Sequence, residues 1–104
     1  MSKPALFIKT RCQPGKRDEV RRLWEQHLKP RVQDGDTQDA YFYCYDLQDP
    51  NTFYIFELYA SQDAMEANSK APWFWEYMQA AGPLLDGQPE VGMTTAVWGK
   101  GIPV

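Results

Sequence analysis

Hydrophobic residues occupy both faces of two consecutive segments, which the pattern predicts to be neighbouring β-strands. Residues 41–47 read YFYCYDL and residues 53–59 read FYIFELY, with an Asp-Pro-Asn turn predicted between them. Successive side chains of a strand point to opposite faces, so Tyr43 and Phe42 are expected on different faces of the sheet. A sheet that is apolar on both faces needs two covers. Helices of the same chain can provide one, and a second copy of the chain is expected to provide the other.

The periodicity of the remaining sequence predicts the order strand, helix, two strands, two helices, strand. Besides the pair above, the expected elements are strands over residues 5–12 and 90–98, and helices from residue 16 to a stop at 34–36, over 62–69, and from 71 to a stop at 82–83. Pro30 removes a backbone N–H, so it is expected to kink or loosen the first helix near its end. Ser61 is the expected N-cap of the second helix.

This order of elements predicts an α+β fold, a ferredoxin-like antiparallel sheet with helices on one face. Residues 1–104 are expected to form a single domain. In that architecture the first two strands are separated by the third, so Cys12 and Cys44 are expected to stay unpaired. Two subunits that stack their uncovered sheet faces about a two-fold axis would form a homodimer, a dimeric α+β barrel.

Composition narrows the class of function. The chain has 104 residues and a net charge of −3, which gives no electrostatic footprint for nucleic acid. No apolar run approaches the roughly 18 residues that suggest a membrane span, and the N-terminus shows no signal-peptide pattern. Cys and His lack the spacing of a metal site. A cytoplasmic protein with reduced thiols, no metal and no membrane partner is the expectation.

Four segments form a recognisable combination. They are the strand, PGK and mixed-charge helix of residues 9–19, the LQDP turn at 47–50, the FYIFELY strand, and SQDAMEANSKAPWFWEYM at 61–78. Together they resemble the antibiotic biosynthesis monooxygenase domain family, with the similarity running from about Ala5 to Trp98. The resemblance implies a dimeric ferredoxin-like barrel, often a cofactor-independent oxygenase that oxidises quinols or polyphenols. It also implies a pocket between the sheet and the helices of each protomer.

The resemblance also directs attention to Asn68, because many family members have His at the matching position. An amide cannot act as a base at neutral pH, but it can orient a phenol or stabilise a developing oxyanion. Some cofactor-free members are thought to use Asn and Trp. The haem-degrading branch of the same fold has an axial His and a strand Asn where this sequence offers Met78 and Ile8, so haem degradation is not expected.

Three polar residues are the candidate catalytic groups: Asn68, Glu57 and His27. Glu57 lies in an aromatic strand, where it either faces a pocket with a raised pKa or pairs with Lys9 or Arg11. His27, the only histidine, lies at the edge of the apolar stripe of the first helix. It is either a proton acceptor above the pocket or a half-exposed helix residue. Asn68 is either a hydrogen-bond donor to substrate or an exposed polar residue.

Four aromatic side chains are the candidate substrate contacts: Trp73, Phe74, Tyr77 and Tyr43. They would form a wall around a planar ligand, or alternatively belong to the core. The predicted function is oxidation of a small quinol or polyphenol-type aromatic by O₂ without a cofactor. The alternative is a non-enzymatic dimer that binds a small apolar ligand.

Overall fold

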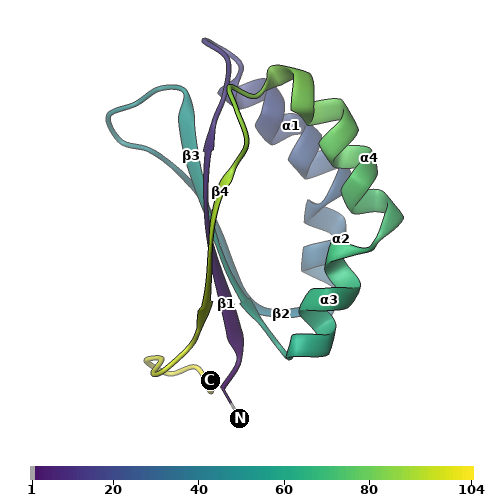
Figure 1. The fold of residues 1–104 in the computed structure, drawn as a ribbon, viewed down its shortest axis with the longest axis vertical. Helices are drawn as coiled ribbons and strands as arrows, with labels where there is room; N and C mark the ends of the chain where they lie inside the picture. The colour runs from purple at the N-terminus through teal and green to yellow at the C-terminus, as the bar shows by residue number, and fades with distance from the viewer. Residues whose placement is uncertain (1) are drawn as a thin grey trace.

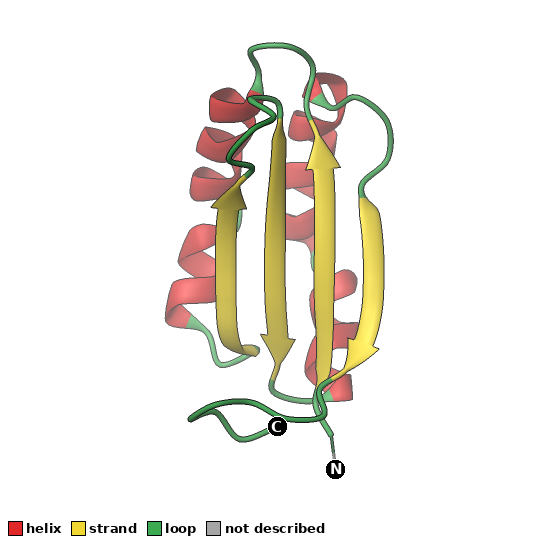
Figure 2. Ribbon diagram, turned by 90° about the vertical axis from the view of Figure 1, so that its left-hand side faces the viewer, coloured by secondary structure: helices red, strands yellow, loops and turns green. Residues whose placement is uncertain are grey.

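The chain folds into a four-stranded antiparallel sheet with its helices on one face, as the computed structural model of residues 2–104 shows (Figures 1 and 2). The strand order is β2-β3-β1-β4, which confirms the predicted α+β, ferredoxin-like arrangement. The elements are β1 Pro4–Arg11, α1 Arg17–His27, α2 Lys29–Asp34, β2 Gln38–Tyr45, β3 Thr52–Tyr59, α3 Gln62–Ser69, α4 Pro72–Ala81, the 3₁₀ turn η1 Gly82–Leu84, and β4 Glu90–Thr95.

Local sequence signals explain where several helices begin and end. The first predicted helix divides into α1 and α2 at Leu28, because Pro30 lies in the first turn of α2, where its missing N–H costs least. Ser61 caps α3 as predicted, with its Oγ accepting a hydrogen bond from the backbone N–H of Ala64 at 3.0 Å. Both predictions depended only on neighbours in sequence.

Two predicted strands have wrong boundaries. The second strand spans Gln38–Tyr45 instead of 41–47, and Leu47 is fully exposed in the turn. The reason is Asp46, whose Oδ1 accepts hydrogen bonds from the backbone N–H groups of the second and third residues after it and so turns the chain away. The last strand ends at Thr95 instead of Trp98. Thr95 pairs with Pro4, the first residue of β1, and only one further backbone hydrogen bond among the described residues, from Ala96 N–H to Lys3 O at 2.8 Å, follows this pair.

The hydrophobic core lies between the sheet and helices α1 and α4. Its buried members are Cys12, Val20, Trp24, Leu28, Phe53, Ile55, Tyr77 and Ala81. Every third or fourth residue of α1 points into it, which is the spacing that the sequence pattern used. Both cysteines are free thiols. Cys12, which directly follows β1, is buried, and Cys44 in β2 is exposed.

The opposite face of the sheet carries exposed phenylalanines. Phe42, Phe56 and Phe7 lie in one cross-strand row of β2, β3 and β1. Phe7 and Phe42 are 54% and 56% exposed, and the ring of Phe56 lies between theirs at centroid distances of 5.0 and 6.1 Å. The prediction that both faces of the sheet are apolar is therefore confirmed. Within the described part of the chain, no helix has both the length and the apolar character needed to cross a bilayer.

Candidate functional site

Glu57 is a buried carboxylate on the helix-facing side of β3, near the end of the sheet that α3 covers (Figure 1). Gln38 Nε2 and Tyr59 Oη donate hydrogen bonds to the same oxygen, Oε1, at 3.1 and 2.9 Å. The other oxygen, Oε2, receives no hydrogen bond from the described residues. One side of the carboxylate is thus anchored, and the other is available to an incoming proton donor.

Asn68 joins this cluster through Tyr59. Asn68 Nδ2, on α3, donates to Tyr59 Oη at 3.1 Å, and Tyr59 in turn donates to Glu57. Tyr59 is buried and Asn68 is half-buried. The four residues Gln38, Glu57, Tyr59 and Asn68, called here the carboxylate cluster, therefore form one continuous hydrogen-bond network between two strands and a helix.

Burial determines the proton chemistry of the carboxylate cluster. Loss of solvent raises the pKa of Glu57 above its ordinary value, and the hydrogen bonds from Gln38 and Tyr59 offset part of this rise. Burial, together with the adjacent Glu57 carboxylate, raises the pKa of the Tyr59 hydroxyl well above its ordinary value. At neutral pH Tyr59 therefore remains a hydrogen-bond donor, and Glu57 is a stronger base than an exposed glutamate.

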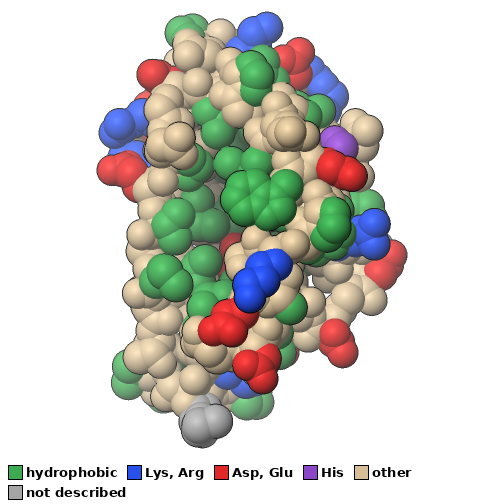
Figure 3. All heavy atoms as spheres, turned by 45° about the vertical axis from the view of Figure 1, so that its right-hand side comes forward, with side chains coloured by type: hydrophobic (Ala, Val, Ile, Leu, Met, Phe, Trp, Pro, Cys, Tyr) green, Lys and Arg blue, Asp and Glu red, His purple; other side chains and the backbone are tan. Residues whose placement is uncertain are grey.

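The helix layer leaves the β4 side of the sheet uncovered. Leu6 and Met93 continue the cross-strand row of Glu57, on the same helix-facing side of the sheet. Met93 is nevertheless 70% exposed, and Val91 in the next row is 52% exposed. Figure 3 shows hydrophobic side chains gathered where this edge of the sheet meets the helices, with an acidic group visible among them. The register thus places Leu6 and Met93 between Glu57 and the exposed β4 edge of the sheet.

The predicted ion pair of Glu57 is wrong. Lys9 pairs with Tyr54 in the register of β1 and β3, which places Lys9 and Arg11 on the face of the sheet away from the helices. Glu57 pairs with Leu6 and faces the helices. Strand alternation alone separates the two kinds of charge, so the partners of Glu57 are the neutral Gln38 and Tyr59.

His27 lies apart from the carboxylate cluster. It is half-buried at the end of α1 and borders a surface groove of about 490 Å³ together with Arg31, Trp73 and Glu76. The guanidinium carbon of Arg31 lies 5.8 Å from the centroid of the Trp73 ring. The structure thus brings His27 and Trp73 together, and Glu57 and Asn68 together, in two different places.

The other predicted aromatic contacts pack against the core. Tyr77 is buried, and Tyr43 and Phe74 are half-buried against the core cluster. The Tyr43 hydroxyl is buried without a hydrogen-bond partner among the described residues. The ring of Tyr43 stacks on Phe53 at a centroid distance of 4.7 Å. These positions give the helix-facing side of the sheet an aromatic lining.

Sequence reasoning missed Tyr59 and Gln38 as members of the carboxylate cluster. Tyr59 had a usable signal, because it follows Glu57 by two residues in a strand and so shares its face. Gln38 had no such signal. Strict alternation from Tyr41 would place Gln38 on the face away from the helices, but a register shift between Gln38 and Ala40 reverses this orientation.

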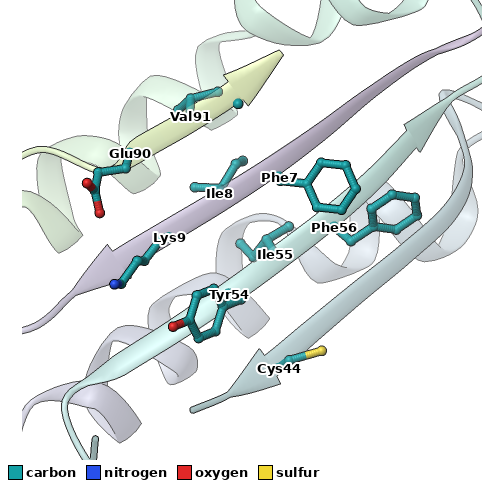
Figure 4. Close-up of a pocket in the computed structure, with 10 residues that line it drawn as sticks. Phe7, Ile8, Lys9, Cys44, Tyr54, Ile55, Phe56, Glu90 and Val91 are labelled. Carbon is teal, nitrogen blue, oxygen red and sulfur yellow. The ribbon is translucent and has the colours of Figure 1, made fainter. Parts of the chain in front are cut away.

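A second concavity lies on the face of the sheet away from the helices. It is a groove of about 430 Å³ bordered by Phe7, Phe56, Tyr54 and Cys44, with Lys9 and Glu90 at one end (Figure 4). The rings of Phe7 and Phe56 lie beside each other on neighbouring strands in Figure 4. Its lining is mainly apolar, as expected of a surface that another protein chain covers.

Fold and carboxylate cluster together define a small α+β protein with a buried carboxylate beneath a helix layer. The family model for antibiotic biosynthesis monooxygenases matches residues 5–80. The chain therefore belongs to the antibiotic biosynthesis monooxygenase family. A search of curated proteins by sequence found no match.

Solved structures share this fold. One, from Chloroflexus aurantiacus, carries the provisional name antibiotic biosynthesis monooxygenase and is 24% identical, with coverage of 98% of this chain and 100% of that one and a TM-score of 0.80. A Caulobacter crescentus protein with the same provisional name is 21% identical, with 93% and 92% coverage and a TM-score of 0.85. Rv0793 from Mycobacterium tuberculosis is 22% identical, with 94% and 98% coverage and a TM-score of 0.80. At these identities the likeness shows the fold alone.

Proposed function

We propose that the protein is a cofactor-independent monooxygenase that oxidises a quinol or polyphenol-type aromatic with O₂, and that the carboxylate cluster is its proton-handling site. The observation that carries this proposal is the buried Glu57, hydrogen-bonded on one oxygen only and linked through Tyr59 to Asn68. Family membership supports the same reaction class.

Glu57 is the proposed proton acceptor. A phenolic substrate must lose its hydroxyl proton before it reacts readily with O₂, and Glu57 Oε2 is free to accept it. The raised pKa of Glu57 brings its basicity closer to neutral pH, where a general base is most effective. His27 makes no contact with this cluster, so it is assigned no direct part in the proton transfer.

Asn68 is the proposed stabiliser of the substrate anion. Its amide group has two N–H hydrogens, and one of them is used in the bond to Tyr59. The second can donate to the phenolate oxygen as negative charge develops there. Phe74 and Tyr77 of α4, with Tyr43 below them, are the proposed aromatic contacts of the ring.

The reaction balances without a metal or an organic cofactor. The substrate anion transfers one electron to O₂, which gives a substrate radical and superoxide. Their coupling forms a ring peroxide anion, which takes back the proton held by Glu57 to give a hydroperoxide. Loss of water from the hydroperoxide leaves a quinone carbonyl at the former C–H position. One O₂ is consumed and one water is released per quinone. Burial of this radical pair away from solvent favours its recombination over escape.

Oxygen uptake with a panel of hydroxynaphthalenes, anthrones and hydroquinones tests the proposal. Glu57→Gln should lose proton abstraction while keeping an acceptor for Gln38 and Tyr59, and Asn68→Ala should lose anion stabilisation. Each loss is expected to be about 10²-fold or more in kcat/KM. Glu66→Gln, an exposed carboxylate change on α3, is the matched control and should leave the rate unchanged. Equal rates in the wild type, Glu57→Gln and Asn68→Ala would contradict the assignment.

The exposed phenylalanine face is the proposed homodimer interface. Exposed apolar surface of this extent marks an interaction site, and a symmetric dimer would pair Phe7, Phe42 and Phe56 of two subunits. Sedimentation at low micromolar concentration is expected to show a dimer, and Phe42→Glu is expected to dissociate it. Leu47→Glu makes the same change at a fully exposed turn and should leave the dimer intact. A stable wild-type monomer would contradict this model.

The alternative function is non-catalytic binding of a small apolar ligand. It is favoured by one observation, that the cluster has Asn68 where an imidazole would serve as a base near neutral pH. Tryptophan fluorescence titration with the same aromatic panel separates the two functions. Saturable quenching without oxygen uptake would support binding alone.

A further inference from the structure

Four oxidisable aromatic rings form a continuous chain between β2 and α1. Tyr41, Tyr43 and Tyr45 alternate along β2 and so share its helix-facing side. Trp24 of α1 lies over the first two, with centroid distances of 5.8 Å to Tyr41 and 4.5 Å to Tyr43. Tyr43 and Tyr45 follow at 6.3 Å, and Trp24 Nε1 donates to Tyr41 Oη at 2.9 Å.

The inner end of this chain adjoins the carboxylate cluster. Tyr41 is the direct cross-strand partner of Glu57. Tyr59 lies two residues farther along the same face, and such diagonal neighbours are about 7–8 Å apart. An oxidant formed beside Glu57 and Tyr59 would therefore have Tyr41 as a neighbour.

The outer end of the chain is at the protein surface. Tyr45 Oη donates to Asp18 Oδ1 at 2.6 Å, a short hydrogen bond of the charge-assisted kind. The guanidinium carbons of Arg17 and Arg21 lie 3.7 and 5.7 Å from the centroid of its ring. Tyr45 thus has a fixed proton acceptor, Asp18, which Tyr43 lacks among the described residues.

Proton acceptors decide where an electron hole can stop. A phenol that loses an electron becomes a strong acid and must release its hydroxyl proton to persist as a radical. Among the residues that the structure describes, the buried hydroxyl of Tyr43 has no hydrogen-bond partner, whereas the hydroxyl of Tyr45 has Asp18. An indole can lose an electron without immediate loss of its proton, so Trp24 is suited to relay the hole and Tyr45 to retain it.

We propose that Tyr41, Trp24, Tyr43 and Tyr45 carry an oxidising equivalent from the carboxylate cluster to the surface. The source is a peroxyl radical formed in the site when a substrate radical adds a second O₂ instead of coupling with superoxide. Only this source rests on the proposed function. The path would protect the buried aromatic residues from oxidation.

The transfer balances as one electron and one proton at each end. The peroxyl radical in the site gains one electron from the chain and one proton from solvent, and becomes a hydroperoxide. Tyr45 loses one electron to the chain and its hydroxyl proton to Asp18 Oδ1. The resulting neutral tyrosyl radical at the surface is then reduced by a soluble one-electron donor of the ascorbate or thiol class.

A photochemical experiment tests the path without substrate turnover. Cys44→Ser removes the exposed thiol, and Asn68→Cys provides an attachment point for a ruthenium polypyridyl sensitiser next to Tyr59. A flash without O₂, in the presence of an irreversible cobalt(III) acceptor, generates Ru(III) at the inner end. A nitroso spin trap then captures tyrosyl radicals, and mass spectrometry locates the adducts.

The expected result is a trapped radical at Tyr45. Trp24→Phe, which keeps an aromatic ring in the core, should remove most of this adduct. Asp18→Asn changes an exposed side chain, and it should lower the same yield by removing the proton acceptor of Tyr45. Tyr54→Phe is the matched control, because Tyr54 also donates to an aspartate, at 2.9 Å, but lies on the opposite face of the sheet.

An equal yield of Tyr45 adduct in the labelled protein that retains Trp24 and in its Trp24→Phe variant, with unchanged circular dichroism, would overturn the proposal. So would a Tyr45 yield that is unaffected by Asp18→Asn. Absence of oxygen uptake would refute the proposed function alone, since the flash experiment uses neither substrate nor O₂.

Discussion

Replacement of Glu57 by glutamine should stabilise the protein, and the gain should depend on pH. The carboxylate is buried, and burial raises its pKa in the folded state above the ordinary value of 4.5. Glutamine has nearly the same shape, and its Oε1 can accept the hydrogen bonds from Gln38 and Tyr59. The change therefore removes a buried negative charge while leaving both donors satisfied.

The sign follows from proton linkage. Between the unfolded pKa and the raised folded pKa of Glu57, the folded state holds a proton that the unfolded state has released. The free energy of unfolding of the wild type therefore falls as pH rises through this window, by up to about 1.4 kcal/mol per pH unit. The Glu57→Gln protein has no such dependence at this position. Its advantage should be smallest below pH 4.5, grow through the window and become constant above the folded pKa.

Urea denaturation of both proteins from pH 4 to pH 8 at constant ionic strength measures this difference. Contributions of the other titrating groups cancel when the two free energies are subtracted at each pH. A difference for Glu57→Gln that is flat, or that shrinks as pH rises, would refute the reasoning that burial dominates the pKa of Glu57.

Three further outcomes are expected. Ser61→Ala should cost about 1 kcal/mol through loss of the α3 cap, a fall in melting temperature of about 4–8 °C in a thermal melt; an unchanged melting temperature would contradict it. Trp73→Phe should cost roughly 1–3 kcal/mol in urea denaturation without changing oxygen uptake per folded molecule, and lower uptake at full stability would instead place Trp73 at the substrate. In native protein a maleimide should react with exposed Cys44 but not with buried Cys12. The reaction of Cys44 should slow as protein concentration rises and the dimer forms, and a rate independent of concentration would argue against the proposed dimer interface on the exposed phenylalanine face.

The sequence was most informative where structure depends on local chemistry or on alternation. Pro30, Ser61 and the two apolar faces around Phe42 were predicted because each follows from neighbours along one element. Leu47 was predicted in the strand because its apolar side chain fits the alternation. It lies in the turn because the Asp46 side chain accepts hydrogen bonds from the backbone that follows and ends the strand.

The candidate site was harder to predict because its contacts join distant elements. Glu57 and Asn68 were identified as candidates, but they are linked only through hydrogen bonds to Tyr59. The packing of α3 against β3 brings Asn68 to Tyr59, and no pattern within one segment predicts this packing. The expected partners Lys9 and Arg11 were excluded by the register of β1 against β3. Register of this kind depends on the whole sheet, so periodicity within one segment could not supply it.

The irregularity at the start of β2 has an electrostatic consequence. In a regular strand, counting back from Tyr41 would place Asp39 on the helix-facing side, near Glu57, and would turn Gln38 outward. Because the extra residue lies between Gln38 and Ala40, Gln38 faces Glu57 instead, and Asp39 forms an ion pair with Lys3 at the surface. This one bulge keeps a second negative charge away from Glu57 and supplies a neutral hydrogen-bond donor in its place. The charge of the carboxylate cluster is therefore set by the backbone as well as by the side chains.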